Sequence, residues 1–322
     1  MAFKVFIPTD VAEAGKAYLR EHGCDVVMAS SNDEETVKKE VVGCNAILVR
    51  ISKVTKEIID AAGEGLKVIA RHGIGVDNID VEYATSKGVW VTNGPVSNIN
   101  SVAEAVMMLM LMCSRNTFAV DCEFRNGHGD YSARYRFNGC ELEGKTLGLI
   151  GLGKIGTLVA KKAHFGFGMK VIGYDAYLPK DKVDQCIEFV SSIETVLAES
   201  DYISVHIPAL PSTKNFIGAK LLKMMKKTAF FINAARGEVV DEDALREALI
   251  SGEIRGAGLD CYQPEPPSPK NPILTMKNVI CTPHNAAHTQ EALNNMSLHA
   301  AMGIVEVLND QIPTWPINNI KR

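Results

Sequence analysis

The stretch TLGLIGLGKIGTLVAKKAHFGFGMKVIGYD, residues Thr146–Asp175, decides the fold of this chain. It opens with a short apolar run, Thr146–Ile150, suited to a buried parallel strand and continues without a spacer into a glycine-rich turn at residues 151–156. Apolar residues then recur at helical spacing, and a second strand-like run, Lys170–Tyr174, ends at Asp175. This order of strand, glycine turn, helix, strand and acid is typical of a unit that binds a dinucleotide.

The residues of the glycine turn each have a physical task. Gly151 permits a tight turn, Gly153 lets a pyrophosphate approach the backbone, and Gly156 lets the helix pack closely on the strand. Lys154 and Ile155 open the helix, whose free N–H groups and positive dipole end attract phosphates. We therefore predict that these five residues bind the cofactor. A turn that serves packing alone is the structural alternative.

The acid at the end of the second strand indicates which cofactor binds. Asp175 lies 19 positions after Gly156, and a separation of about 20 is expected for an acid that binds the ribose hydroxyls. Its charge would repel the 2′-phosphate of NADP, and the nearest cations that follow are Lys180 and Lys182. The sequence therefore predicts NAD.

The composition is that of an ordinary soluble globular protein, with 46% hydrophobic and 22% charged residues. A chain of 322 residues is long enough for two domains, each with its own core. The net charge of -4 and the lack of a basic run argue against nucleic acid as a partner. The amino terminus, MAFKVFIPTD, is expected to enter a strand rather than a signal peptide.

Two further patterns bear on location. The most apolar stretch, Val102–Cys113, contains Glu104 and is too short to span a bilayer, so we expect a buried helix and no membrane partner. Eight cysteines occur without a CxxC pair, which predicts free thiols in a reducing cytoplasm. For Cys261, which lies near candidates described below, a buried structural thiol is the expected role.

Short apolar runs alternate with helical patterns over roughly the first hundred residues. The expected strands are Lys4–Pro8, Asp25–Ala29, Ala46–Val49, Lys67–Ala70 and Val89–Thr92. The expected helices are Val11–His22, Asp33–Val42, Lys56–Ala62 and Val81–Ser86. Five strands joined by four helical crossovers predict a compact parallel α/β domain.

Two loops of this domain carry polar candidates at the carboxyl ends of expected strands, where ligands bind in such sheets. One loop contains Arg50 and Lys53, and the other begins at Arg71. Gly73 and Gly75 favour a backbone-amide anion site in the second loop. For Arg71 and Lys53, a solvated surface charge is an equal alternative.

A long apolar helix, Asn98–Arg115, is expected to carry the chain into a second domain, followed by a polar connector, Asn126–Gly144. Later strand-like runs lie at Glu188–Val190, Tyr202–Val205, Ala229–Ile232, Ala257–Leu259 and Val279–Cys281, with helical patterns between several of them. A final helix, Gln290–Leu308, is expected to close the first domain. We therefore assign residues 1–98 and 290–322 to a substrate-binding domain and residues 99–289 to an NAD-binding domain.

Three residues at the ends of the second domain's expected strands are candidates for the chemistry. Arg236 offers a guanidinium fork that suits bidentate binding of a substrate carboxylate. Glu265 lies in the proline-rich segment Gly258–Pro266, which holds the acid in a rigid loop. His284 could exchange a proton at neutral pH, because a neighbouring glutamate would raise its pKa.

Each of these residues taken alone has a simpler explanation. Arg236 fits a surface charge beside a helix, Glu265 a solvated loop acid, and His284 a hydrogen-bonded histidine near a strand end. For a lone histidine the simpler explanation is favoured. The occurrence of all three on carboxyl-side loops of one cofactor-binding sheet favours a catalytic set.

Six motifs make the chain similar to a known family over nearly its whole length. They are RHGIGVDNID at Arg71–Asp80, the helix entry Ser101–Glu104, GLGKIG, NAARG, LDCYQPEP and TPHNAAHT. With these motifs the chain resembles the D-isomer-specific 2-hydroxyacid dehydrogenase family. The resemblance implies an α/β fold of two doubly wound parallel-sheet domains, a Rossmann dinucleotide-binding domain and a flavodoxin-like substrate domain.

The resemblance also implies the catalytic and substrate-binding residues. Arg236, Glu265 and His284 match the family's catalytic arginine, glutamate and histidine. The backbone amides of Gly73 and Ile74 are implied to hold the substrate carboxylate. In the implied mechanism Arg236 clamps the carboxylate, His284 takes the hydroxyl proton as hydride leaves, and Glu265 keeps His284 oriented and basic.

Further cofactor contacts follow from the same resemblance. Asp260 is implied to approach the nicotinamide carboxamide, and Val102, His206 and Pro208 are implied to line the cofactor site. One departure is His288, where the family more often has a small residue.

The substrate is predicted less narrowly. Arg50, Lys53 and Arg134 resemble cations that bind phosphate in the phosphoglycerate dehydrogenase branch. From its length we expect this chain to lack the regulatory domain that many of those enzymes carry, and short forms of that branch exist. We place 3-phosphoglycerate ahead of an unphosphorylated acid such as lactate, glycerate or glyoxylate.

Two other functions fit parts of the sequence. The family includes corepressors that sense NAD and retain the catalytic residues. A metal hydrolase would use His284, His288 and His299, but Asn285 stands where a zincin helix needs glutamate, so we expect no metal. A homodimer is implied, with Val102–Cys113 and Asn126–Gly144 as the interface, and internal core is the alternative for those apolar residues.

Overall fold

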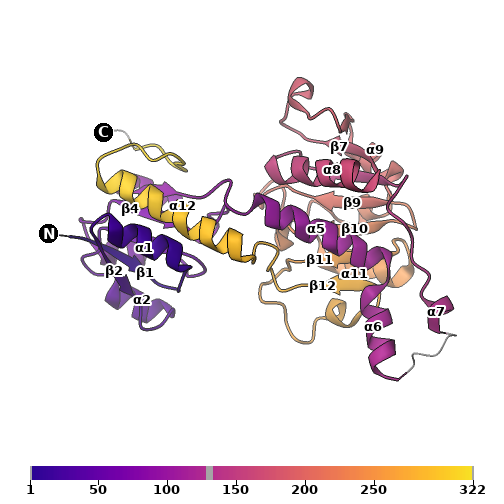
Figure 1. The fold of residues 1–322 in the computed structure, drawn as a ribbon, viewed down its shortest axis with the longest axis horizontal. Helices are drawn as coiled ribbons and strands as arrows, with labels where there is room; N and C mark the ends of the chain where they lie inside the picture. Colours follow the sequence, from indigo (N-terminus) through magenta and orange to yellow (C-terminus); the bar gives the residue numbers. More distant parts are fainter. Residues whose placement is uncertain (1, 128–132, 321–322) are drawn as a thin grey trace. The chain divides into compact units, whose positions relative to one another are not determined.

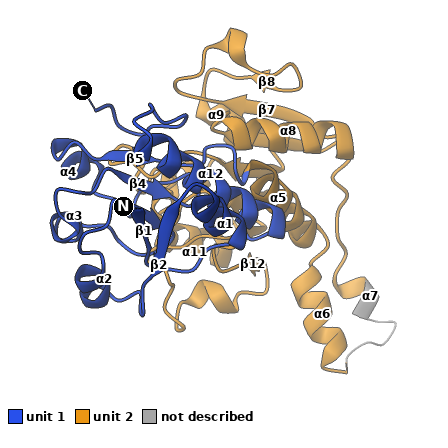
Figure 2. Ribbon diagram, turned by 60° about the vertical axis from the view of Figure 1, so that its left-hand side comes forward, with its two compact units in different colours: residues 1–98, 288–322 blue, residues 99–287 orange. Residues whose placement is uncertain are grey.

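The computed structural model describes residues 2–127 and 133–320, apart from the side chains of residues 133 and 134. It divides into two compact units, Met1–Asn98 with His288–Arg322, and Ile99–Ala287 (Figure 2). The sequence placed the first division at the same residue and the second two residues later. The functions assigned to the two domains remain predictions.

The first unit contains a parallel sheet of five strands in the order β2-β1-β3-β4-β5. This is the flavodoxin-like order of a doubly wound sheet, in agreement with the predicted fold. The strands are nearly continuous apolar runs, as expected when helices cover both faces. They are β1 (Phe3–Ile7), β2 (Cys24–Met28), β3 (Ala46–Val49), β4 (Val68–Arg71) and β5 (Trp90–Thr92).

Helices cover both faces of this sheet (Figure 1). One face packs against α1 (Glu13–Glu21) and α12 (Gln290–Leu308). The other packs against α2 (Glu34–Glu40), α3 (Lys56–Ala62) and α4 (Val81–Ser86). The predicted closing helix is therefore present, and α12 completes a core that begins at the amino terminus.

The segment after α12 continues along the same unit. Pro316 forms an antiparallel bridge with Thr92, and the N–H of Ile317 donates to the carbonyl of Val91 at 2.8 Å. The Asn318 side chain accepts from the N–H of Val91, also at 2.8 Å. The carboxyl-terminal segment therefore pairs with the outer edge of β5.

The second unit contains a parallel sheet of seven strands in the order β12-β11-β10-β9-β6-β7-β8. The strand order reverses beside β6, which is the Rossmann arrangement, and the glycine turn follows this strand. The strands are β6 (Thr146–Ile150), β7 (Lys170–Tyr174), β8 (Glu188–Phe189), β9 (Tyr202–Val205), β10 (Phe230–Asn233), β11 (Gly256–Leu259) and β12 (Val279–Cys281).

Helices also cover both faces of the second sheet. One face packs against α5 (Ile99–Ser114) and α8 (Lys154–Phe167). The other packs against α9 (Ile193–Glu199), α10 (Ala219–Leu222) and α11 (Glu242–Ser251). Short 3-10 turns lie at Lys180–Lys182, Gly237–Val239 and Pro272–Thr275.

Two helices were not predicted. α6 (Thr117–Arg125) follows α5 after Asn116, whose left-handed φ of 51° breaks the helix. Ala119 is the buried residue of α6, so this helix has little apolar face to signal it. α7 (Ala133–Arg136) interrupts the connector Asn126–Gly144, which was expected to be a loop throughout.

Within the described ranges, no single helix has the length and hydropathy needed to cross a membrane. α5 and α6 meet that test only when taken together, and they are bent by 61° at the break between them.

Candidate active site

The glycine turn after β6 has the geometry that a dinucleotide site requires. Gly151 has a φ of +97°, and a Cβ added there would lie 2.7 Å from the His206 carbonyl oxygen. A Cβ on Gly156 would lie 2.3 Å from the Gly151 carbonyl oxygen. Both positions therefore require glycine, one for its backbone conformation and both for close packing.

Gly153 differs, because close packing does not require a glycine at this position. A Cβ added there would meet no described atom within 4 Å. Gly153 is the N-cap of α8, and no described side chain caps that helix. The helix start at Lys154 and Ile155 thus presents backbone N–H groups beside open space, which fits the pyrophosphate of a dinucleotide.

Asp175 lies at the end of β7 and closes this turn. Its Oδ2 accepts from the Leu152 N–H at 2.8 Å, and its Oδ1 accepts from the N–H groups of Tyr177 and Leu178, both at 2.9 Å. Burial raises the pKa of Asp175, but these three amides outweigh burial and leave the pKa below its usual value. An oriented, ionised carboxylate at this place fits the ribose hydroxyls of NAD.

The remaining predicted cofactor residues lie around the same sheet edge or on α5. His206 follows β9, and its Nε2 is 3.0 Å from the Ser204 hydroxyl. Burial lowers the pKa of His206 to about 4, so the ring is neutral at pH 7. Pro208 is exposed in the next loop, and Val102 is buried on α5. Their contacts with a cofactor remain predictions.

Arg236, Glu265 and His284 follow β10, β11 and β12, which are neighbours in the sheet. Because parallel strands end at one edge, the three loops lie at the same carboxyl edge of the dinucleotide-binding sheet. The structure therefore brings the predicted catalytic loops to one place.

His284 and Glu265 form a direct pair. Nδ1 of His284 lies 2.7 Å from Oε2 of Glu265, and the two side chains are 45% and 35% exposed. The other carboxylate oxygen, Oε1, accepts from the Tyr262 N–H at 2.9 Å. An ionised carboxylate only accepts, so Nδ1 carries the proton and Nε2 of the neutral ring is the proton acceptor.

The charges around this pair shift both pKa values. The hydrogen bond that His284 donates to Glu265 raises the pKa of His284, and the Asp260 charge adds to it, while burial and the Arg236 charge oppose them. Burial raises the pKa of Glu265, but the hydrogen bonds from His284 and Tyr262 outweigh burial and lower it. The net effect is an ionised glutamate that makes His284 more basic.

Arg236 is held by the turn that precedes it. Asn233 is 1% exposed, and its Nδ2 donates to the Arg236 carbonyl at 2.9 Å while its Oδ1 accepts from the Ala235 N–H at 3.0 Å. Nη1 of Arg236 donates to the Ala235 carbonyl at 2.7 Å. A Cβ on Gly237 would lie 1.9 Å from the Tyr262 carbonyl oxygen, so glycine is needed where this turn meets the Glu265 loop.

Asp260 is buried and holds the loop that carries His284. Its Oδ1 accepts from the Thr282 hydroxyl at 2.6 Å and from the Asn285 N–H at 2.9 Å. Its Oδ2 accepts from the Ala286 N–H at 2.9 Å. The implied approach of Asp260 to the nicotinamide remains a prediction, and the contacts observed are with the histidine loop.

Tyr262 has a structural task that the sequence analysis missed. Its side chain is 3% exposed, and its hydroxyl lies 3.1 Å from the carbonyl oxygens of both Leu259 and Thr282. Tyr262 therefore connects the strand before Glu265 to the strand before His284. A tyrosine between the motif's acid and its prolines gave no separate signal in the sequence.

The predicted substrate residues of the first unit lie on loops after β3 and β4, which are neighbours in its sheet. Arg71 donates to the backbone carbonyls of Gly75 at 2.6 Å and His72 at 2.7 Å, and also contacts the Arg50 carbonyl. Gly73 has a φ of +123°. The guanidinium therefore supports the loop in which Gly73 lies.

The remaining predicted substrate residues are Arg50, Lys53, Ile74 and Arg134. Nη1 of Arg50 lies 3.3 Å from the Asp10 carbonyl, and Lys53 is exposed. The carbonyl of Ile74 accepts from Nδ2 of Asn93 at 2.7 Å. The Arg134 side chain lies outside the described residues. Substrate contacts of this group remain predictions.

Among the side chains that the structure describes, no three histidine, cysteine, aspartate or glutamate residues gather as a metal site would require.

The fold and the site define a two-unit α/β protein with a dinucleotide-binding sheet whose carboxyl edge carries an arginine and a histidine–glutamate pair. Residues 107–286 match the model of the D-isomer specific 2-hydroxyacid dehydrogenase, NAD binding domain. This chain belongs to the D-isomer specific 2-hydroxyacid dehydrogenase family, as the sequence predicted.

Individual members of this family are similar to the chain in sequence and in structure. The chain is 42% identical to the D-3-phosphoglycerate dehydrogenase of Methanocaldococcus jannaschii, over 98% of this chain and 59% of that one. It is 40% identical to the hydroxypyruvate reductase of Thermotoga maritima, over 86% and 89% respectively. The NAD-complexed D-isomer specific 2-hydroxyacid dehydrogenase from Lactobacillus delbrueckii ssp. bulgaricus aligns with a TM-score of 0.83 and 27% identity, over 98% of this chain and 100% of that chain.

The first relatives are longer than this chain, which spans between 50% and 59% of their length. The part that matches includes the NAD-binding domain of the family, so NAD is its cofactor class.

Proposed function

We propose that this chain is an NAD-dependent dehydrogenase that interconverts D-2-hydroxy acids and 2-oxoacids. The observation that carries the proposal is the 2.7 Å contact between His284 and Glu265 on the carboxyl edge of the dinucleotide-binding sheet. A base of raised pKa beside a bound nicotinamide is what hydroxyl oxidation needs, because a proton and a hydride leave together. Membership of a dehydrogenase family supports it.

Each residue has a task in this reaction. Bound NAD would supply the acceptor for the C2 hydrogen as hydride, and NADH would supply the hydride in the reverse direction. Arg236 binds the substrate carboxylate with two parallel N–H groups and so fixes the position of C2. Nε2 of His284 takes the hydroxyl proton as the carbonyl forms, and the resulting imidazolium is stabilised by Glu265. In the reduction, the protonated His284 returns that proton to the oxygen.

We assign NAD binding to the unit Ile99–Ala287 and substrate binding to the unit formed by residues 2–98 and 288–320. The glycine turn and Asp175 support the first assignment. For the second, the loops of Arg50, Lys53 and Arg71 lie at the strand ends where such sheets bind ligands.

A phosphorylated acid, 3-phosphoglycerate, is our first candidate substrate. Arg50, Lys53 and Arg134 are the cations proposed to bind its phosphate. The likeness to D-3-phosphoglycerate dehydrogenases supports this choice, and the likeness to a hydroxypyruvate reductase keeps small unphosphorylated acids as the second candidate.

The test is NADH oxidation, followed by its absorbance, with 3-phosphohydroxypyruvate, hydroxypyruvate, glyoxylate and pyruvate. We expect turnover, with the highest kcat/KM for the phosphorylated substrate. Preference for a small unphosphorylated acid would overturn the proposed phosphate site but would still support the proposed dehydrogenase activity. Tight NADH binding without turnover of any 2-oxoacid would overturn the dehydrogenase and favour a protein that senses NAD.

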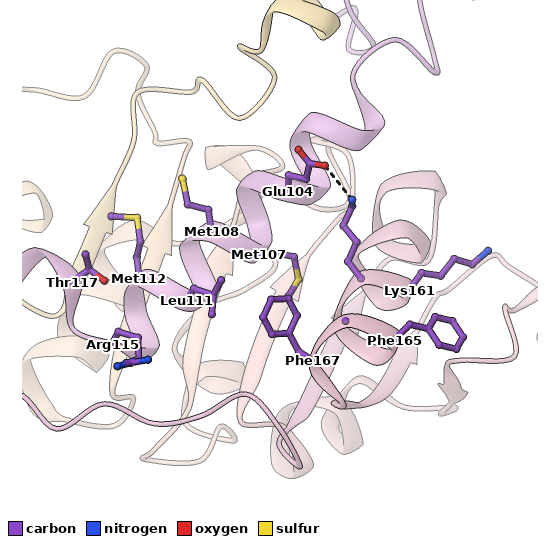
Figure 3. Close-up of a pocket in the computed structure, with 12 residues that line it drawn as sticks. Glu104, Met107, Met108, Leu111, Met112, Arg115, Thr117, Lys161, Phe165 and Phe167 are labelled. Carbon is purple, nitrogen blue, oxygen red and sulfur yellow. Dashed lines mark hydrogen bonds and ion pairs between the residues drawn. The ribbon is translucent and has the colours of Figure 1, made fainter.

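We also propose a homodimer formed through the second unit. A groove of about 870 Å³ lies between α5 and α8, and Figure 3 shows methionine and phenylalanine side chains along it. Its apolar lining residues are Met107, Met108, Leu111, Met112, Phe165 and Phe167. Leaving such side chains in water costs free energy, which a partner would recover.

A second copy of this chain is the occupant that the charges favour. The rim of the groove carries Glu104, paired with Lys162 at 3.2 Å, together with Lys161 and Arg115. A two-fold interface brings the same patch from both copies together, so a rim of mixed sign can pair with itself. Exposed Phe118 and Phe124 on the adjoining α6 extend the apolar surface.

A cytoplasmic location is proposed as well. All eight cysteines are free thiols, and Cys113 and Cys261 are buried. Proteins of oxidising compartments more often pair their cysteines.

A further inference from the structure

The loop that carries Glu265 is attached at both ends to one carboxylate. Glu242 is the first residue of α11, and its Oε2 accepts from the backbone N–H of Gln263 at 3.2 Å. Its Oε1 accepts from Nδ2 of Asn271 at 2.5 Å. These two contacts bracket Glu265, so Glu242 fixes the start and the end of the segment that we call the Glu265 loop, residues 263–271.

The composition of the Glu265 loop explains why a side chain must hold it. Four of its residues are prolines, at positions 264, 266, 267 and 269, and proline has no N–H to donate. The contacts within the loop are local, such as the Asn271 N–H to the Ser268 carbonyl at 2.8 Å. A stiff segment with few backbone donors keeps its position mainly through its ends.

We propose that Glu242 is a positioning residue, which holds the Glu265 loop so that the Glu265 carboxylate stays against Nδ1 of His284. Glu242 touches none of the reacting atoms and acts through the loop alone. The inference rests on the proposed function, in which His284 exchanges the proton.

The effect of loosening the loop follows from the groups that face His284. Glu265 and Asp260 raise the pKa of His284, and burial and Arg236 lower it. The Glu265 hydrogen bond is the largest of these effects. When the loop moves, that bond is lost for part of the time, whereas Arg236 and Asp260 are held by other segments. The pKa of His284 then falls.

Three variants separate positioning from general stability. Glu242→Ala removes both anchors, whereas Glu242→Gln keeps an oxygen for the Gln263 N–H and a similar shape. Asp243→Ala is the matched control, because Asp243 lies in the same first turn of α11 but is 84% exposed and pairs with Arg246. It reproduces the loss of one negative charge near the helix start without touching the loop.

The first readout is the titration of His284 by proton NMR in the 322-residue chain without cofactor, its signal assigned with His284→Gln. We expect a lower His284 pKa in Glu242→Ala, and values near the wild type in Glu242→Gln and Asp243→Ala. The second readout is kcat/KM for 2-oxoacid reduction against pH. Its fall at high pH should begin at lower pH in Glu242→Ala, and kcat should drop by about tenfold to a hundredfold.

The outcomes distinguish this inference from the proposed function. An unchanged His284 titration in Glu242→Ala overturns the positioning role, whatever the activity. A lowered titration in Glu242→Ala that Glu242→Gln restores supports it even if the wild type turns over no 2-oxoacid, which would overturn only the dehydrogenase. Equal loss in Asp243→Ala would overturn it too, since the effect would then belong to the helix start.

Discussion

At the residue scale, Arg236 tests the geometry of substrate binding. In Arg236→Lys the charge stays but the planar fork is lost, so one of two parallel hydrogen bonds to the carboxylate disappears. We expect kcat/KM for 2-oxoacids to fall by roughly a hundredfold or more, because small misplacement of bound reactants is costly. NADH affinity, measured by fluorescence, should stay the same. Arg246→Lys, on the exposed side of α11, is the control, and equal activity in Arg236→Lys would remove its assigned role.

A second prediction at this scale concerns His72 and pH. His72 is 3% exposed, and burial together with the positive charges of Arg50 and Arg71 lowers its pKa to about 4. The unfolded chain takes up this proton near pH 6.5 and the folded chain only near 4. The contribution of the neutral His72 ring to the free energy of unfolding is therefore fully present above pH 6.5 and is lost as pH falls towards 4. The loss amounts to about 3 kcal/mol.

Urea unfolding between pH 7 and pH 4.5 measures this effect. We expect His72→Asn to be less stable than the wild type at pH 7 but to lose less stability on acidification. His22→Asn, which removes an exposed histidine, should follow the wild-type curve. If the stability of His72→Asn shows the same pH dependence as that of the wild type, His72 is not the group that takes up the proton on unfolding.

At the scale of the element, the glycine turn contains Gly153, whose substitution should weaken cofactor binding without lowering the stability of the fold. A Cβ at Gly153 meets open space and its φ of -66° suits any residue, so Gly153→Ala should retain or slightly gain stability. The added methyl would lie where the pyrophosphate approaches. NADH binding should therefore weaken by about 1–3 kcal/mol, or roughly 5- to 150-fold.

The matched control is Gly218, which is also a glycine at the N-cap of a helix in the same unit. A Cβ there lies at ordinary contact distance, 3.6 Å from the nearest atom. Gly218→Ala should keep both stability and NADH affinity. Unaltered NADH binding in Gly153→Ala would show that the cofactor does not approach this turn closely.

The elements also show how far sequence patterns predict a fold. β6, β7, β9 and β12 have the predicted bounds, because each is a short apolar run ended by glycine or a polar residue. α6 was missed, since it has little buried face, and apolar spacing signals only helices that pack. The helical pattern Lys220–Met225 runs three residues past the end of α10, because apolar Met224 and Met225 continue the pattern after the helix stops.

The site was predictable in part for a similar reason. Arg236, Glu265 and His284 follow predicted strands, so parallel topology was enough to bring their loops together. The residues that hold those loops were not predictable. Tyr262 and Glu242 bond to backbone groups 20 and 21 residues away, at Thr282 and Gln263. Asn233 instead shapes the turn of Arg236 through bonds to backbone groups two and three residues along the chain. Such partners depend on register and loop path, which residue patterns do not contain.

At the scale of the whole molecule, the proposed dimer can be tested on α5. Met108 is 42% exposed and lines the groove, so Met108→Glu places a charge in the apolar part of the interface. We expect the mass measured by light scattering to fall from that of a dimer to that of a monomer, with NADH binding retained. Ile250→Glu, at an exposed apolar residue on α11, should remain dimeric. A monomeric wild type at micromolar concentration would contradict the dimer.

The path of the chain through its two units has a consequence for synthesis on the ribosome. Residues 2–98 emerge before the second unit, but the core they share with α12 and the edge of β5 that residues 316–318 cover are completed only when residues 290–318 have been made. The unit Ile99–Ala287 is continuous and is fully synthesised earlier. Of the two units, the one that is started earlier is thus finished later, and during that interval β5 offers an unpaired edge that nascent chains can join.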